Sequence, residues 1–156
     1  MDALVKHASA LAELNGHFLG MPPVAALQPE ILEWHDGLLR LRAPLAANVN
    51  DKGCAFGGSM VSLMTIAAWG LVSLVLADAA ASAEVYVADS QVRYLKPVFQ
   101  DIDVEARFDD DGDRLTLAET LSRQGRAGAR LRARTLLVDG AVAATFSGRF
   151  VAIGKS

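Results

Sequence analysis

The residues best suited to chemistry lie in a polar, glycine-rich turn that leads into a long apolar segment. Residues 48–59 read Asn-Val-Asn-Asp-Lys-Gly-Cys-Ala-Phe-Gly-Gly-Ser. Backbone amides at a helix start are unpaired and lie at positive potential, so they can stabilise a developing oxyanion, each donor contributing on the order of 3 kcal/mol. We predict that Gly57 and Gly58 open a helix that holds a carbonyl oxygen. Close packing of the helix start is the alternative reason for the two glycines.

The segment that follows the turn has no polar face. From Gly53 to Ala77 there are 25 residues without a formal charge, in a chain that is 21% charged. A helix that is apolar all round is buried in a protein or spans a membrane. Trp69 lies in the middle of the segment rather than at a headgroup level, and the strands that follow need an apolar body to cover them. We therefore predict a buried central helix over residues 57–81 and no membrane span.

The rest of the chain alternates apolar and polar residues at strand spacing. Residues 1–22 form an N-terminal helical region that Pro22 and Pro23 end. Strands with turns between them are expected at 31–45 (with a turn at Asp36-Gly37), 84–95, 101–108, 115–121, 129–135 and 141–153. An antiparallel sheet with one wet face buries the other against something apolar. The prediction is a single α+β domain, residues 1–156, in which a curved antiparallel sheet of about five to six strands wraps around the central helix.

Composition excludes several classes of function. The formal net charge is −3 and the pI is near 5.5, which argues against a nucleic-acid partner. The chain has one cysteine and three scattered histidines, so we expect neither an internal disulfide nor a metal site. The N-terminus has no basic start followed by an apolar core, and the expected location is cytoplasmic.

Several short motifs together resemble the hot-dog thioesterases, and most closely the thioesterase family typified by the C-terminal domain of YiiD. The motifs are Ala43-Pro44-Leu45, the 48–59 turn, Trp69-Gly70, Ala88-Asp89-Ser90 and Arg93-Tyr94-Leu95-Lys96-Pro97. The resemblance spans residues 30–152 and implies a hot-dog fold. It also implies an acyl-thioester substrate, carried by coenzyme A or acyl carrier protein, at a homodimer interface, with a tetramer as a further possibility. No separate cofactor is implied.

The resemblance suggests roles for nine residues. Those assigned to catalysis are Asn50, Gly57, Thr65 and Asp89, and those assigned to substrate binding are Phe56, Gly58, Ser59, Ser90 and Tyr94. In the PaaI-like branch of hot-dog enzymes the motif is Asn-x-x-Gly-x-x-His-Gly-Gly, with a carboxylate nine residues after the histidine. Here Phe56 replaces the histidine and Thr65 occupies the carboxylate position. The hydrolytic base of that branch is therefore missing from this chain.

Each candidate side chain also has a simpler interpretation. Asn48 and Asn50 are also typical turn formers, and Thr65 can bond to the carbonyl of the preceding helical turn. Asp89 is a general base if it points inward with Val85 and Val87, and an exposed strand residue otherwise. Cys54 is more typical of a buried thiol than of a nucleophile.

The arginines at 123–134 are typical of the wet face of a strand, although some of them, or Arg93 and Lys96, could contact a coenzyme A phosphate or an acidic carrier protein. Three functions remain open at this point. They are an acyl-thioester hydrolase, a non-catalytic acyl-thioester-binding module and, least favoured because histidine is scarce, a dehydratase.

Overall fold

The computed structural model describes residues 2–155 and contains one six-stranded sheet with four α-helices. Met1, part of the predicted N-terminal helical region, lies outside the described residues. In chain order the elements are α1 (Ala3–Gly20), α2 (Pro22–Ala25), β1 (Glu30–His35), β2 (Leu38–Ala43), η1 (Leu45–Ala47), α3 (Gly57–Asp78), β3 (Ala83–Tyr94), β4 (Ile102–Phe108), α4 (Asp111–Gln124), β5 (Arg126–Leu136) and β6 (Val142–Gly154).

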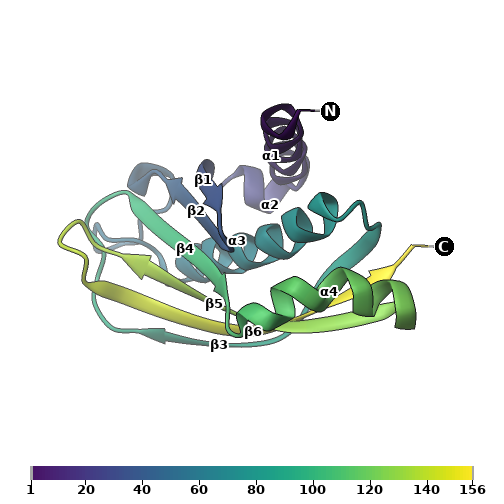
Figure 1. Ribbon diagram of the computed structural model, residues 1–156. Helices are drawn as coiled ribbons and strands as arrows, with labels where there is room; N and C mark the ends of the chain where they lie inside the picture. The colour runs from purple at the N-terminus through teal and green to yellow at the C-terminus, as the bar shows by residue number, and fades with distance from the viewer. Residues whose placement is uncertain (1, 156) are drawn as a thin grey trace.

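The sheet is antiparallel throughout and has the strand order β1-β2-β4-β5-β6-β3. Figure 1 shows it curving beneath α3, with α1 on the far side of that helix. The predicted α+β architecture, a curved sheet wrapped around a long central helix, is confirmed. The predicted turn at Asp36-Gly37 is also present, and a second turn lies at Asp139-Gly140. Gly37 and Gly140 adopt φ values of +75° and +87° in the β1–β2 and β5–β6 hairpins.

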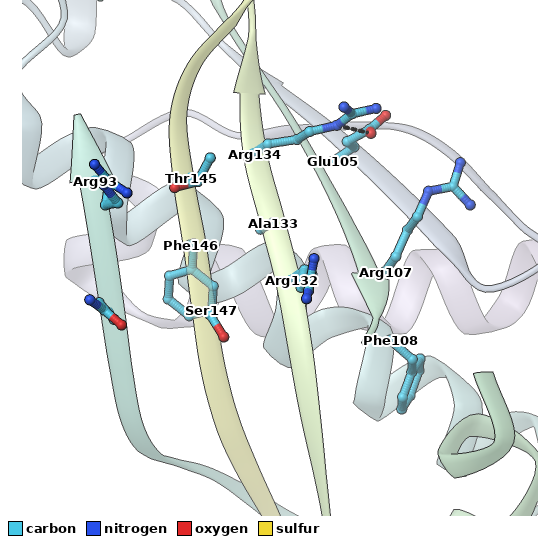
Figure 2. Close-up of a pocket in the computed structure, with 11 residues that line it drawn as sticks. Arg93, Glu105, Arg107, Phe108, Arg132, Ala133, Arg134, Thr145, Phe146 and Ser147 are labelled. Carbon is cyan, nitrogen blue, oxygen red and sulfur yellow. Dashed lines mark hydrogen bonds and ion pairs between the residues drawn. The ribbon is translucent and has the colours of Figure 1, made fainter. Parts of the chain in front are cut away.

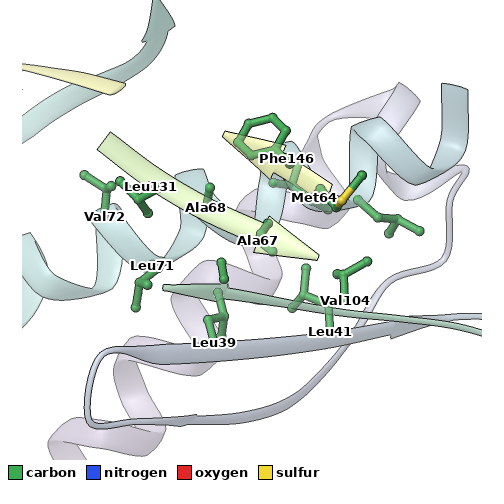
Figure 3. Packing of buried hydrophobic residues seen from close by; sticks show 14 of the residues in the cluster. Leu39, Leu41, Met64, Ala67, Ala68, Leu71, Val72, Val104, Leu131 and Phe146 are labelled. Atoms are coloured by element: carbon green, nitrogen blue, oxygen red, sulfur yellow. The ribbon is translucent and has the colours of Figure 1, made fainter. Parts of the chain in front are cut away.

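Helix α3 is buried because the sheet supplies the apolar surroundings that its sequence requires. Ala67, Ala68 and Leu71 are fully buried and face strand residues of β2, β4, β5 and β6 (Figure 3). Helix α1 covers the other side of α3 at Gly70, where an added Cβ would lie 3.1 Å from Leu39 and 3.2 Å from Leu14. Although α3 is long and apolar enough to cross a membrane, it forms the centre of this core.

The predicted strand at residues 115–121 is wrong, because these residues belong to helix α4. Leu117 and Leu121 are buried at helical spacing, whereas Leu115 is 70% exposed. The helix has strong end signals: the Asp110 side chain accepts from the Gly112 amide, and Gly125 ends the helix at a φ of +73°. The Leu115-x-Leu117 spacing imitates a strand, but the Leu117–Leu121 spacing and the caps determine the structure.

The edge strand β3 is long and unusually apolar for an edge. Its partner on one side is β6, and the other edge is unpaired within residues 2–155. Large apolar side chains in and just after β3 are about half exposed or more: Tyr86, Val87, Tyr94, Leu95 and Phe99. Trp69 of α3 donates its indole N–H to the Val85 carbonyl oxygen at 2.9 Å, which holds the strand against the helix.

Candidate active site

The loop before α3 is held rigid by the side chain of Asn50. Its Oδ1 accepts hydrogen bonds from the amides of Lys52 at 2.8 Å and Cys54 at 3.2 Å, while its backbone N–H donates to the Cys54 carbonyl at 2.8 Å. Gly53 completes this turn with a φ of +83°. The Asn50 oxygen is thus occupied within the loop. The amide nitrogen, 3.3 Å from the buried Cys54 sulfur, is its other polar group.

Asn48 fixes the same loop to the body of the protein. Its buried side-chain amide donates to the carbonyl oxygens of Leu27 and Pro44, both at 2.9 Å. Its own carbonyl oxygen accepts from the Phe56 amide at 2.7 Å, and the Ala55 amide donates to Val98 at 2.8 Å. The residue that immediately precedes α3 is therefore held in place before any ligand arrives.

The N-terminus of α3 presents three free amides. Phe56 occupies the N-cap position and provides no side-chain cap, and the first bond of the helix runs from the Met60 amide to the Phe56 carbonyl at 3.1 Å. Within residues 2–155 the amides of Gly57, Gly58 and Ser59 have no hydrogen-bond acceptor. A helix of 22 residues with an uncapped start is a preformed site for an oxyanion or another negative group.

The two glycines at this helix start also lie against aromatic rings. A Cβ on Gly57 would lie 3.4 Å from the Tyr94 ring, and a Cβ on Gly58 would lie only 2.5 Å from Cε2 of Phe56. The Phe56 ring, 55% exposed, therefore lies over Gly58. The packing and oxyanion interpretations are compatible, because the absence of side chains both admits the two rings and leaves the amides open.

A cavity of about 300 Å³ opens beside this helix start. Its volume is at the lower end of the range for small-molecule sites. One wall comes from the loop and helix and the other from the end of β3 and the segment after it. The lining residues are Ala55, Gly57, Met60, Tyr94, Leu95, Lys96 and Pro97. The arrangement can hold a carbonyl group against backbone donors beside an apolar chain.

The structure brings together most of the predicted site. Phe56, Gly57, Gly58 and Ser59 form the helix start, and Tyr94 donates from its hydroxyl to the Gly57 carbonyl oxygen at 3.0 Å. Leu95 and Pro97 were not predicted as site residues. They reach the cavity because the end of β3 lies against the helix start. The motif Arg93-Tyr94-Leu95-Lys96-Pro97 contains both residues, but it does not by itself indicate that contact.

Thr65 lies two turns into α3, and its hydroxyl is already used. The Oγ1 atom donates to the Val61 carbonyl oxygen at 2.7 Å, as the simpler interpretation expects. Thr65 is partly buried, on the side of α3 that also carries Trp69. A hydroxyl in this position can hold a water molecule but cannot deprotonate it.

Asp89 does not face the helix. Of the two positions left open for it, inward with Val85 and Val87 or exposed, it occupies the exposed one. A β-bulge shifts the register between Val87 and Asp89, which places Asp89 opposite Arg149. The Asp89 carboxylate lies 3.3 Å from Arg149 and 3.8 Å from Arg130, on the outer face of the sheet. Asp89 is therefore separated by the sheet from the α3 start of its own chain.

Ser90 follows the bulge and lies on the same side of β3 as Tyr94, because side chains in a strand alternate between faces. It is paired with Gly148 and is exposed. In a regular strand Asp89 would point to the helix side and Ser90 to the outer face. The bulge reverses these two directions. The serine, and not the carboxylate, is the residue directed to the helix side.

This chain is similar in sequence and in structure to known proteins. The model of the family described as "Putative thioesterase (yiiD_Cterm)" matches residues 13–154. The chain belongs to this thioesterase family. A Shewanella oneidensis protein described as a putative thioesterase is 30% identical, with a TM-score of 0.84 over 94% of this chain and 99% of that one.

Two structures of lower sequence identity share the hot-dog fold of the family. A Chlorobaculum tepidum protein of unknown function is 24% identical, with a TM-score of 0.85 over 92% of this chain and 94% of that one. A Haemophilus influenzae thioesterase is 18% identical, with a TM-score of 0.66 over 85% of this chain and 82% of that one. The predicted family and fold are both confirmed.

Proposed function

We propose that this family member is a cytoplasmic acyl-thioester hydrolase whose substrate carbonyl is held by the amides at the start of α3. The observation that carries the proposal is the uncapped N-terminus of α3, with three free amides next to an apolar cavity. As a nucleophile adds to a thioester, negative charge develops on the carbonyl oxygen. Donors that are fixed before the reaction stabilise that charge without reorganisation.

The apolar cavity supports an acyl substrate. Met60, Leu95 and Pro97 contribute apolar surface beside the helix start. Lys96 lies at the same cavity and provides a cation for the phosphate of a coenzyme A or carrier-protein arm. Asn50 contributes a side-chain amide in the adjoining loop, where it can orient water or the carbonyl.

The proposed enzyme is a homodimer joined through β3. An edge strand of 12 residues with an unpaired backbone edge is a template for pairing with another chain. The exposed apolar side chains of Tyr86, Val87 and Leu95 lie in or beside this edge. A partner paired along β3 would approach the start of α3, because Tyr94 at the end of the strand contacts Gly57. Groups from the partner would then complete the site.

A proline at position 57 tests the oxyanion role directly. Gly57 is the first helical residue, where proline is tolerated, and Phe56 has a φ of −66° and a ψ of 130°, which proline accepts in a preceding residue. Gly57→Pro removes one N–H, and Gly57→Ala is the matched control that keeps it. We expect thiol release from acyl-coenzyme A to fall about 100- to 1,000-fold in the proline variant and less than about tenfold in the alanine variant. Equal activity in the two variants would refute the oxyanion assignment.

A non-catalytic acyl-thioester-binding module is the second candidate. It is favoured by Phe56 and by Thr65, whose hydroxyl is committed to Val61, at the two positions where the PaaI-like branch has its histidine and acid. Wild-type protein that binds acyl-coenzyme A without releasing thiol would establish this candidate. The same assay with Asp89→Asn and Asn50→Ala tests two of the three other sequence-based assignments to catalysis, the third being Thr65.

A further inference from the structure

The outer face of the sheet, opposite to α3, contains a hollow of about 610 Å³ that is rich in arginine (Figure 2). Its polar lining consists of Gln91, Arg93, Glu105, Arg107, Arg132, Arg134, Thr145 and Ser147. Four arginines thus surround one carboxylate, in a chain whose formal net charge is −3. The lining of the hollow is therefore locally positive, although the chain as a whole is acidic.

The hollow exists because short side chains lie between long ones. Thr145 of β6 is paired with Arg93 of β3 on one side and with Arg134 of β5 on the other. In the neighbouring row, Ser147 lies between Gln91 and Arg132. Since strands are about 4.8 Å apart, the backbones of Arg93 and Arg134 are separated by roughly 10 Å across β6. Two guanidinium groups can therefore reach one ligand lying over two hydroxyls.

The positive charges in the hollow are incompletely compensated. Arg134 pairs with Glu105, and Arg132 pairs with Asp109. Arg93 and Arg107 have no carboxylate within 4.0 Å in residues 2–155. Arg107 is also directly opposite Arg132 on the neighbouring strand, and like charges in that relationship are destabilising. An anion bound in the hollow would relieve this repulsion.

We propose that this hollow binds a small organic molecule with a diphosphate or two separate phosphate groups. Arginine forks match phosphate oxygens in bidentate geometry, and the Thr145 and Ser147 hydroxyls can donate to further oxygens of the same groups. The volume lies within the range of small-molecule sites. A second copy of the chain is not the proposed occupant. A twofold contact through this face would bring the arginines of both copies together, and their like charges would repel.

The ligand is distinct from a thioester bound at the start of α3. Arg93 and Tyr94 are neighbours in β3 and so point to opposite faces of the sheet, and Tyr94 contacts Gly57. The hollow and the helix start are therefore separated by the sheet itself. A variant can therefore lose phosphate binding in the hollow and keep thioester hydrolysis, or the reverse, so the two proposals can fail separately.

Titration calorimetry with inorganic pyrophosphate and with ADP tests the proposal, and adenosine serves as the uncharged comparison. We expect saturable binding of both phosphorylated probes below about 1 mM, weakened as salt is raised, and no binding of adenosine. Arg93→Gln should weaken pyrophosphate binding at least about tenfold. Arg126→Gln is the matched control, because Arg126 lies in the same sheet, outside the hollow, with no carboxylate within 4.0 Å in residues 2–155.

A second variant keeps the test decisive. Thr145→Glu adds a carboxylate to the floor of the hollow without removing any arginine, and it should abolish binding of both probes while circular dichroism stays unchanged. Failure of the wild-type protein to bind pyrophosphate and ADP would overturn the proposal. Equal weakening by Arg93→Gln and Arg126→Gln would also overturn it, as would binding of an acidic protein in place of both probes.

Discussion

The hydroxyl of Tyr94 donates a hydrogen bond of 3.0 Å to the carbonyl oxygen of Gly57, and this bond joins the edge strand β3 to the first residue of α3. The Tyr94 ring also lies against the Cα of Gly57, at the distance where an added Cβ would touch it. This side chain therefore helps to fix how the strand end and the helix start are placed relative to each other. The cavity beside them depends on that placement.

Replacing this tyrosine by phenylalanine isolates the hydrogen bond, because the ring packing is kept. Tyr94→Phe should lower the free energy of unfolding by about 0.5–1.5 kcal/mol, measured by urea denaturation. Tyr86→Phe is the control, since Tyr86 lies in the same strand, is 56% exposed and forms no side-chain hydrogen bond in residues 2–155. A larger loss from Tyr86→Phe than from Tyr94→Phe would contradict the described role of the bond.

The α4 helix can be tested with two leucines that a strand would place on the same face. Leu117→Ala should lower the free energy of unfolding by about 2–4 kcal/mol, because the side chain is 3% exposed. Leu115→Ala should change it by less than about 0.5 kcal/mol, because that side chain is 70% exposed. Similar losses from the two substitutions, measured by denaturant unfolding, would indicate the strand and exclude the helix.

The proposed dimer predicts that a charge on the edge strand separates the two chains. Val87 is 46% exposed in β3, and Val87→Lys should raise the dimer dissociation constant at least about tenfold and reduce thioesterase activity with it. Light scattering coupled to size-exclusion chromatography measures the change. Val138→Lys is the same substitution in the β5–β6 hairpin, at a residue that is 88% exposed, and it should leave the mass unchanged. A protein that is monomeric before any substitution would refute the dimer.

The β1–β2 hairpin predicts a pH dependence of stability. A hydrogen bond from Arg40, directly opposite in the hairpin, lowers the pKa of Glu33, and a second one from His35 acts in the same direction. The folded pKa then lies below the unfolded value. The stabilising contribution is present above the unfolded pKa and is lost as the pH falls through the folded pKa.

The difference in Tm between wild type and Glu33→Gln should therefore be larger near pH 7 than near about pH 3. Glu119→Gln provides the control, because the Glu119 carboxylate is exposed and lies 4.0 Å from its nearest cation, Arg123. If the Tm difference of Glu33→Gln grows toward acid pH, the hairpin interaction does not act as described.

The central helix and most of the sheet could be predicted because their patterns depend on burial alone. A segment without charge must be enclosed, and strands with one apolar face must cover something, which leaves few arrangements for a chain of this length. Ile102, Val104, Ala106 and Phe108 alternate regularly and are all buried, as predicted. The same reasoning fails for α4, where the Leu115-x-Leu117 spacing imitates a strand, whereas the Leu117–Leu121 spacing and the end caps fit a helix.

The site was less predictable, because it depends on one bulge and on contacts between distant segments. Asp89 would share a face with Val87 in a regular strand, and no residue at 87–89 signals that the register shifts there. The contact between Tyr94 and Gly57 joins residues that are 37 positions apart. The motif Phe56-Gly57-Gly58 marks the helix start, whereas the residues that close the cavity over it come from tertiary structure.

The bond between the Trp69 indole and the Val85 carbonyl gives the protein a built-in optical reporter. The chain has two tryptophans, and Trp34 stacks on His7 at the other edge of the sheet, with ring centroids 4.6 Å apart. A Trp34→Phe variant would leave only the indole that touches β3. Its emission would then follow any event that loosens or covers this strand, in real time and without an attached label.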